Sequence, residues 1–224
     1  MVPPFAEEAN RARRMFSLQA RQLAEIGYTV FLPDLFGTGD SEGDFADATW
    51  SIWQSDLDAV FAQAEATGLD DLSALALRSG ALLMTDFLAQ QRRTLKKLVY
   101  WHPCTNGALY LRQFLRLRLV ADMLGSGDKR ETANTLLEQL QHGESLEVAG
   151  YMLNPALVLP MADINLETIY PQNAVLVRWF EVVPESQTSL SVPGKKSVAA
   201  WQSQGVDVNE SIVADSQFLS LIHI

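Results

Sequence analysis

The sequence predicts an α/β protein with a mostly parallel sheet flanked by helices. Apolar runs of strand length alternate with amphipathic helical segments along the first 107 residues. Each strand-like run ends in a short turn of glycine, proline or small polar residues, which is typical of the strand–helix connections of parallel sheets. The 224 residues are 48% hydrophobic and 20% charged, a composition that supports a sizeable core.

The first half of the chain supplies three strands and three helices. Ala12, Phe16 and Leu23 place an apolar stripe on a helix over 7–26, which Gly27 ends as a C-cap. The same periodicity predicts two further helices, and short apolar runs predict the strands. In chain order the elements are helix 7–26, strand 28–32, helix 50–67, strand 72–77, helix 81–91 and strand 98–101.

The strand signal fades from residue 108 to about residue 166. Three helices are predicted there, over 109–124, 132–141 and 144–153, and we expect this insertion to form a helical cap. The alternation then resumes with a strand over 174–177, a helix within 192–205 and a last strand over 206–213. We therefore expect two domains: a core formed by 1–107 and 167–218, and the cap formed by 108–166.

Composition excludes several functional classes. The net charge of −10 argues against general binding to nucleic acid, which needs clustered Lys and Arg, and against docking on an anionic membrane surface. No apolar run is long enough to span a membrane, so we expect no membrane insertion and a cytoplasmic protein. Cys104 is the single cysteine and there are three histidines, so we expect neither a disulfide nor a metal site, and no cofactor.

Three local patterns follow one another in the order found in α/β-hydrolases. Residues 31–41 read Phe-Leu-Pro-Asp-Leu-Phe-Gly-Thr-Gly-Asp-Ser and resemble the D-x-x-G-x-G-x-S loop of that superfamily. Residues 75–81, Leu-Ala-Leu-Arg-Ser-Gly-Ala, stand between a strand and a helix, at the place of the nucleophile elbow. Residues 2–5, Val-Pro-Pro-Phe, take the place of the oxyanion loop. The resemblance implies an α/β-hydrolase-like fold whose first loop is braced by Asp34, Gly37 and Gly39.

The ordered set of motifs resembles one branch more closely, the type 2 hydrolase of exosortase A systems. The residues that carry this resemblance are 2–10, 13–15, 34–41, Leu77-Arg78, Gly80-Ala81, Trp101-His102-Pro103 and Gly150-Tyr151. The resemblance covers roughly residues 2 to 218. It implies a link to exopolysaccharide synthesis and to the sorting of proteins with PEP-CTERM tails, and it supplies no substrate.

The two ends of the chain carry a further expectation. The sequence opens at the oxyanion loop, so we expect the first strands of the sheet to be missing. Residues 219–224, Leu-Ser-Leu-Ile-His-Ile, differ from the family and resemble translated adapter sequence. We therefore expect a fragment with a non-native tail at 219–224, with a genuine short tail as the alternative.

The nucleophile position does not carry a serine. An elbow needs small residues two positions either side of the nucleophile, and Ala76 and Gly80 are such a pair, so Arg78 takes that position. Arginine stays protonated and cannot attack a carbonyl as serine does. Ser79, one position later, is either a displaced nucleophile or a hydroxyl that caps the turn. Arg78 is either an anion-binding side chain at a helix N-terminus or part of a structural ion pair.

More than one residue is a candidate for the general base and for the carboxylate that would orient it. Gln217 stands where the superfamily has its histidine, and glutamine cannot act as a base; His223 lies in the tail. His102 ends a strand at the edge where such sheets bind ligands, and it forms a candidate pair with Cys104. The alternatives are a histidine that fixes its loop and a cysteine that packs as a small hydrophobe. The candidate carboxylates are Glu181, Glu185 and Asp163. Because carboxylates are common on protein surfaces, each has an ordinary surface residue as its alternative.

Two functions remain in competition. The first is a hydrolase of an ester, thioester or amide, with Ser79, His102 and Glu181 as candidate catalytic residues and no intact triad. The second is a non-catalytic relative that binds an anionic small molecule or acyl group through Arg78, with Phe5 and Gly80 beside it. In both, the expected partner is a small molecule. A structural partner in a membrane-associated assembly is a third option, which nothing in the sequence favours.

Overall fold

The computed structural model describes residues 1–69, 71–90, 93–124 and 131–214. The chain divides into two compact units. The first contains residues 1–33, 57–105 and the chain from 165 onward, and the second contains 34–56 and 106–164. All residues of the candidate site discussed below, apart from Asp163, belong to the first unit.

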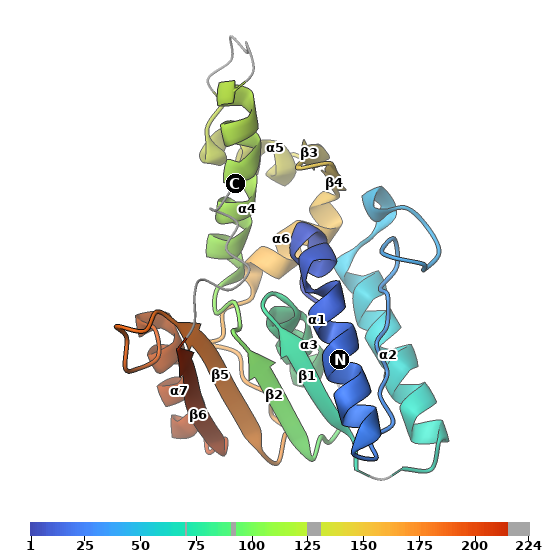
Figure 1. Cartoon of the computed structure of the whole chain (residues 1–224). Helices are drawn as coiled ribbons and strands as arrows, with labels where there is room; N and C mark the ends of the chain where they lie inside the picture. The colour runs from blue at the N-terminus through green and yellow to red at the C-terminus, as the bar shows by residue number, and fades with distance from the viewer. Residues whose placement is uncertain (70, 91–92, 125–130, 215–224) are drawn as a thin grey trace. The chain divides into compact units, whose positions relative to one another are not determined.

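A four-stranded sheet forms the centre of the first unit, in the order β1-β2-β5-β6 (Figure 1). All three pairings are parallel, and the register places Leu77 opposite Trp101 and Trp101 opposite Phe180. The parallel sheet with its flanking helices confirms the predicted fold class. The strands are β1 (Ser73–Leu77), β2 (Lys97–Trp101), β5 (Val177–Val183) and β6 (Val208–Ala214).

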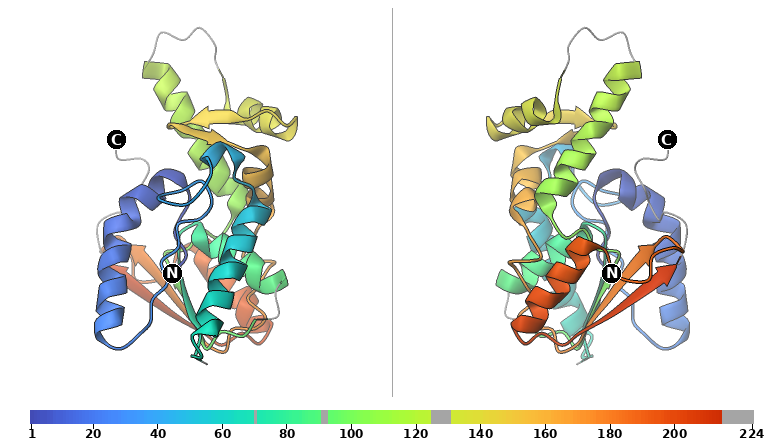
Figure 2. Two further views of the ribbon diagram at one scale, coloured as in Figure 1. Left: turned by 90° about the vertical axis from the view of Figure 1, so that its right-hand side faces the viewer. Right: turned by 90° about the vertical axis from the view of Figure 1, so that its left-hand side faces the viewer.

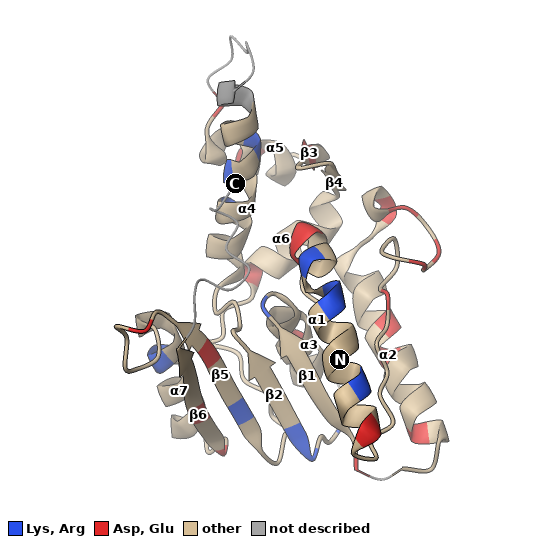
Figure 3. Ribbon diagram, viewed as in Figure 1, with Lys and Arg blue, Asp and Glu red and all other residues tan. Residues whose placement is uncertain are grey.

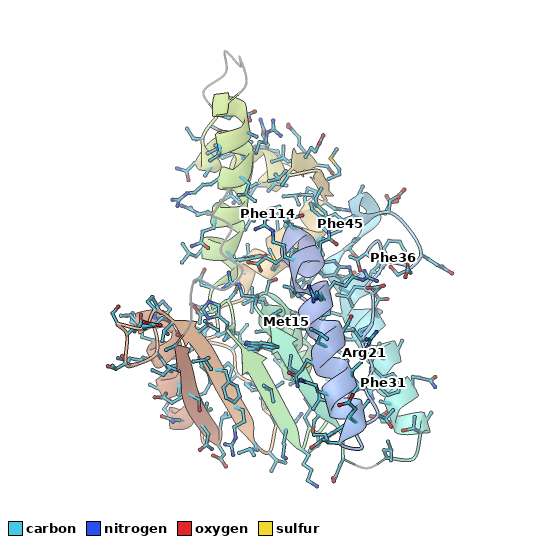
Figure 4. All side chains as sticks on the ribbon, viewed as in Figure 1. Met15, Arg21, Phe31, Phe36, Phe45 and Phe114 are labelled. Carbon is cyan, nitrogen blue, oxygen red and sulfur yellow. The ribbon has the colours of Figure 1, made fainter. Side chains whose placement is uncertain are left out.

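Helices cover both faces of this sheet, with α1 (Ala6–Glu25) on one face and α3 (Gly80–Gln90) and α7 (Val192–Ser203) on the other (Figures 1 and 2). Ala12 and Phe16 of α1 pack against Leu77, with Met15, labelled in Figure 4, beside them. The outer face of α1 carries charges of both signs (Figure 3). On the opposite face, the rings of Tyr100, Trp179 and Trp201 lie 5.3–5.8 Å apart.

The second unit is mostly helical. It contains η1 (Phe45–Asp47), α4 (Gly107–Leu124), α5 (Ala133–Gln141), the strands β3 (Leu146–Val148) and β4 (Tyr151–Leu153), and α6 (Pro155–Asp163). The helix α2 (Trp50–Ala66) begins in this unit and ends in the first. The Asp34 loop is braced as the resemblance implies, because the Asp34 carboxylate accepts the Asp40 N–H at 3.1 Å. A Cβ on Gly39 would overlap that carboxylate.

Two predicted elements are wrong, and a third is displaced, because the strand expected over 174–177 shares only Val177 with β5. Residues 144–153 form an antiparallel hairpin instead of a helix, because Leu146 and Val148 alternate with exposed residues and Ala149-Gly150 adopt positive φ angles of 52° and 82°. Such angles suit a tight hairpin turn. Residues 28–32 form no strand, although the run is apolar, because a strand requires a paired neighbour and among the described residues this segment has no ladder partner.

No described helix combines the length and apolarity needed to cross a membrane.

Candidate functional site

The turn between β1 and α3 has the geometry of a sharp strand-to-helix elbow. Arg78 lies between Leu77, the last residue of the strand, and the start of the helix at Gly80, and its φ is +53°. Residues other than glycine rarely adopt this left-handed conformation, which costs about 1–2 kcal/mol. Gly80 has no room for a side chain, because a Cβ would lie 2.5 Å from the carbonyl oxygen of Pro3. The sequence therefore places Arg78 at the tip of a strained turn, as predicted.

Ser79 is tied to the loop that precedes α1. The Phe5 N–H donates a hydrogen bond of 2.8 Å to the Ser79 hydroxyl oxygen, and both residues are buried. The carbonyl oxygen of Ser79 accepts the N–H of Leu82 in the first turn of α3. The Phe5 amide of the expected oxyanion loop and the Ser79 hydroxyl of the expected elbow are therefore in direct contact.

Arg78 forms an ion pair with Glu8 of α1. Its Nε and Nη2 atoms donate to Glu8 Oε1 at 3.2 and 3.0 Å. The Glu8 side chain has no exposed surface and that of Arg78 is 17% exposed. A buried carboxylate requires a cationic or hydrogen-bonding partner, and Arg78 supplies it. The structure thus shows Arg78 in an ion pair with a buried carboxylate.

His102 follows β2 and is held by β5. Its backbone N–H donates to the Phe180 carbonyl at 2.6 Å, and its ring Nδ1 accepts the Val182 N–H at 3.0 Å. Because Nδ1 accepts, the neutral ring carries its proton on Nε2. Burial, with a smaller contribution from the Arg78 charge, lowers the pKa of His102 to about 4. The histidine is therefore neutral at physiological pH and fixes the loop after β2.

Cys104 is joined to the elbow through its backbone. Its N–H donates to the Arg78 carbonyl at 3.0 Å. Burial raises the pKa of the Cys104 thiol to about 12, although the Arg78 charge opposes this shift. Because the thiolate is the nucleophilic form, a thiol with this pKa is a poor nucleophile. The environment of Cys104 favours the packing interpretation over a Cys–His pair.

The carboxylate of Glu181 is buried and accepts two hydrogen bonds. The Trp179 indole N–H donates to Oε1 at 2.9 Å and the Ser191 backbone N–H donates to Oε2 at 2.8 Å. Gly194 in the first turn of α7 packs so closely that a Cβ there would overlap Oε1. Glu181 thereby links β5 to the start of α7. The two alternatives, Glu185 and Asp163, are exposed.

The three predicted catalytic residues form hydrogen bonds with different partners. Ser79 bonds to the Phe5 amide and His102 to the Val182 amide. Glu181 bonds to the Trp179 indole and the Ser191 amide. Phe5, Glu8, Arg78, Ser79 and Cys104 meet around the elbow, and His102 is near enough for the Arg78 charge to contribute to its lowered pKa. Gln217 and His223 lie outside the described residues. In the described part of the chain, no cluster of three or more metal-ligating side chains is present.

Residues 6–189 match the family described as serine aminopeptidase, S33. The chain belongs to this family, whose fold is the α/β-hydrolase fold. No match was found among curated proteins. The resemblance to an α/β-hydrolase in the sequence is confirmed.

Three solved α/β-hydrolase-fold structures are similar to this family member. Est1E from Butyrivibrio proteoclasticus, solved with ferulic acid bound, is 20% identical in sequence to this chain. The match has a TM-score of 0.56 and covers 90% of this chain and 73% of Est1E. A thermophilic esterase from Thermogutta terrifontis, with malate bound, is 17% identical with a TM-score of 0.55 and coverage of 91% and 77%. VinJ is 15% identical with a TM-score of 0.56 and coverage of 90% and 78%. At these identities the likeness shows the fold.

Glu8 is the site residue that the sequence analysis missed. It precedes Ala12 and Phe16 at intervals of four residues, which places all three on the buried face of α1. An acidic residue at that spacing within an apolar stripe signals a buried carboxylate, and therefore a cationic partner elsewhere in the chain. The signal was present, but it does not identify which arginine is the partner.

Proposed function

We propose that this member of the S33 family binds a small anionic molecule or acyl compound at the elbow, without cleaving it by a serine mechanism. The observation that carries this proposal is the position of Arg78 at the tip of the β1–α3 turn. A guanidinium there cannot act as the nucleophile, but it is suited to hold a carboxylate.

The surroundings of Arg78 support an anion site. The N-terminus of α3 favours negative charge, and the Ala81 and Leu82 N–H groups there already donate to the Arg78 and Ser79 carbonyls. Glu8 orients the guanidinium through its Nε and Nη2 atoms. Phe5 and Gly80 flank the site, Phe5 through its bond to Ser79 and Gly80 as the first residue of the helix. A ligand carboxylate would have to compete with Glu8 for Arg78, so we expect modest affinity.

Calorimetric titration with ferulate and malate tests this proposal, since structures of similar proteins contain these two carboxylates. Glu8→Gln removes the competing charge and should tighten binding by roughly tenfold. The double variant Glu8→Gln/Arg78→Gln removes the cation while keeping the buried pair neutral, and it should abolish binding. Arg11→Gln, which removes an exposed arginine of α1, is the matched control. Equal affinity in the double variant and the wild type would reject the proposal.

A second candidate function is hydrolysis of an ester, thioester or amide with Ser79 as the nucleophile. One observation favours it: the Phe5 N–H of the expected oxyanion loop lies beside the Ser79 hydroxyl, to which it donates at 2.8 Å. In an acyl transfer this N–H would instead have to donate to the oxyanion of the substrate. Fluorophosphonate labelling distinguishes the candidates. A hydrolase should be labelled in the wild type and in Ser203→Ala, an exposed-serine control, but not in Ser79→Ala. Absence of labelling in the folded wild type would count against this mechanism.

We further propose that the protein acts in the cytoplasm as part of an exosortase A system. The ordered set of sequence motifs supports this assignment. The genes beside its own should then encode an exosortase and enzymes of exopolysaccharide synthesis. Neighbouring genes without either would contradict the assignment.

A further inference from the structure

Three chain segments that meet at the elbow contain a residue in the same strained conformation. Among the described residues, four residues other than glycine have positive φ angles. Three of them, Ala6, Arg78 and His102, lie in these segments, with φ angles of 49°, 53° and 46°, and the fourth, Ala149, lies in the turn of the β3–β4 hairpin. Left-handed backbone is unfavourable for residues with a Cβ, and such residues gather at ligand-binding and catalytic sites. The strain at His102 therefore indicates a role beyond the fixing of its loop.

His102 is the neighbour of Arg78 at the carboxyl edge of the sheet. The β1–β2 register ends at Leu77 and Trp101, so Arg78 and His102 are the next residues of two adjacent strands (Figure 1). The Arg78 N–H donates to the Trp101 carbonyl at 3.1 Å, and the Cys104 N–H donates to the Arg78 carbonyl at 3.0 Å. The segment that contains His102 therefore holds both polar groups of the Arg78 backbone.

The ring of His102 replaces a backbone group in the ladder between β2 and β5. The His102 N–H still donates to the Phe180 carbonyl at 2.6 Å. The evenly spaced bonds of a parallel pair would next join the Val182 N–H to the His102 carbonyl. The Val182 N–H donates instead to Nδ1 of the His102 ring, at 3.0 Å. The positive φ of His102 thus accompanies a ring nitrogen in the position of a carbonyl oxygen.

The bond to Nδ1 determines where the ring proton lies. An imidazole nitrogen that accepts a hydrogen bond carries no proton, so Nε2 is the donor of the neutral ring. The two ring nitrogens point outward in nearly opposite directions, and Nε2 therefore points away from β5. The strand order β1-β2-β5 places the elbow on that side of β2.

Burial keeps this donor uncharged. Burial, with a smaller contribution from the Arg78 charge, lowers the pKa of His102 to about 4. The other titratable groups of the elbow are Glu8, which is paired with Arg78, and Cys104, whose pKa burial raises to about 12. At pH 7 the ring and the thiol are both neutral, and the Arg78 guanidinium has an uncharged N–H donor in the neighbouring segment.

We propose that the Nε2–H group of His102 is the second hydrogen-bond donor of the anion site, beside the guanidinium of Arg78. A carboxylate has two oxygens that accept from separate donors, so one oxygen would bond to Arg78 and the other to His102. The ligand class is therefore an ionised carboxylic acid, and His102 selects for its second oxygen. This inference rests on the proposed binding of an anion at Arg78.

Asparagine at position 102 separates the two roles of the ring. Its Oδ1 atom can replace Nδ1 as the acceptor of the Val182 N–H, and asparagine tolerates a positive φ. Its side chain has no group at the position of Nε2. His102→Asn should therefore keep the fold and lose the second donor. His142→Asn is the matched control, because His142 is exposed and belongs to the second unit.

Both substitutions are tested in Glu8→Gln protein, from which the competing carboxylate has been removed, by calorimetric titration with malate and ferulate. His102→Asn should weaken binding by about tenfold, the usual effect of losing a hydrogen bond to a charged group. His142→Asn should change it by less than about twofold. Urea denaturation at pH 7 shows whether the His102→Asn protein is folded.

The wild-type protein provides a measurement that does not depend on the folding of a variant. Nitrogen-15 spectra of the three histidine side chains report which ring nitrogen carries the proton. We expect His102 as the Nε2–H tautomer, and we expect its Nε2–H resonance to move downfield when malate saturates the protein. A histidine that only fixes its loop would keep this resonance unchanged.

The outcomes distinguish this inference from the proposed function. Equal binding by Glu8→Gln proteins with and without His102→Asn overturns the role of His102 and leaves the anion site at Arg78 intact. An Nδ1–H tautomer, or an Nε2–H resonance that malate binding does not move, overturns that role as well. If neither malate nor ferulate binds Glu8→Gln protein that has a native circular dichroism spectrum, the proposed function is rejected, and the role of His102 with it.

Discussion

The Nη2 atom of Arg78 lies 3.0 Å from Oε1 of Glu8, whose side chain is completely buried. The two residues are 70 positions apart, so this pair connects the first helix to the elbow after β1. The elbow is therefore held by a long-range charge interaction as well as by the packing of Gly80 against Pro3.

The first prediction concerns the stability that this pair provides. Arg78→Gln leaves a buried carboxylate without its cation and should lower the free energy of unfolding by about 3 kcal/mol. Glu8→Gln should also be destabilising, and the loss in the double variant should be smaller than the sum by about 1 kcal/mol or more. Urea denaturation measures all three. The exposed pair Glu7–Arg11 is the control, with an expected coupling below about 0.5 kcal/mol. Additive losses at Glu8 and Arg78 would contradict the prediction.

The second prediction concerns acid sensitivity. The pKa of His102 is lowered from 6.5 to about 4 in the folded protein, so the unfolded chain binds its proton more readily. Above pH 6.5 the ring is neutral in the folded and the unfolded protein, and the contribution of His102 to stability is complete. As the pH falls from 6.5 toward 4, the ring becomes protonated in the unfolded chain first, which lowers the free energy of unfolding. The effect is at most about 3 kcal/mol. His102→Asn, chosen because asparagine tolerates a positive φ such as the +46° of His102, should show a shallower loss of stability over this range.

The measurement for His102 is a series of urea denaturations from pH 7 to pH 4. His142→Asn is the matched control, because His142 is exposed. The control should retain the pH dependence of the wild type. An identical slope for His102→Asn and the wild type would show that His102 does not contribute.

The third prediction concerns the reactivity of Cys104. Burial raises its pKa to about 12, so little thiolate exists at pH 8. Iodoacetamide should modify the native protein more than about a hundredfold more slowly than the urea-unfolded chain. Mass spectrometry follows the reaction without ambiguity, because the chain has one cysteine. Rapid alkylation of the native protein would instead indicate an activated thiol.

The fourth prediction concerns Glu181. Its two carboxylate oxygens each accept one hydrogen bond, from Trp179 and from Ser191. Glu181→Gln replaces one carboxylate oxygen by an NH2 group, which donates instead of accepting. The N–H of Trp179 or of Ser191 then loses its acceptor, which should lower the free energy of unfolding by about 1–3 kcal/mol. Thermal or urea denaturation measures the loss, and Glu185→Gln at an exposed position should have little effect. An unchanged stability for Glu181→Gln would mean that these contacts do not hold α7.

The order of the core elements was predictable from the sequence, since apolar periodicity is a local property. The predicted strands and helices around residues 72–101 correspond to β1, α3 and β2. The tip of the elbow was predictable for the same reason, because Ala76 and Gly80 are small neighbours of Arg78 within one short turn. The hairpin over 146–153 was missed because its turn depends on the positive φ of Ala149, which is an unusual residue for that conformation.

Contacts between residues far apart in the sequence could be identified only from the folded structure. The apolar run at 28–32 is strand-like by composition, but strand formation depends on a neighbour that composition does not reveal. The same limit applies to the site residues: the types and spacing of Arg78, His102 and Glu181 identified them as candidates without naming their partners. Those partners, Glu8, the Val182 amide and the Ser191 amide, come from other segments.

Side-chain periodicity and turn chemistry are encoded within a few neighbouring residues, and for this protein they are sufficient for the α/β class, the parallel strands and the arginine at the elbow. Ionisation states and hydrogen-bond partners depend on which surfaces become buried together. Only the tertiary structure shows that α1 brings a carboxylate to Arg78 and that β5 holds the His102 ring.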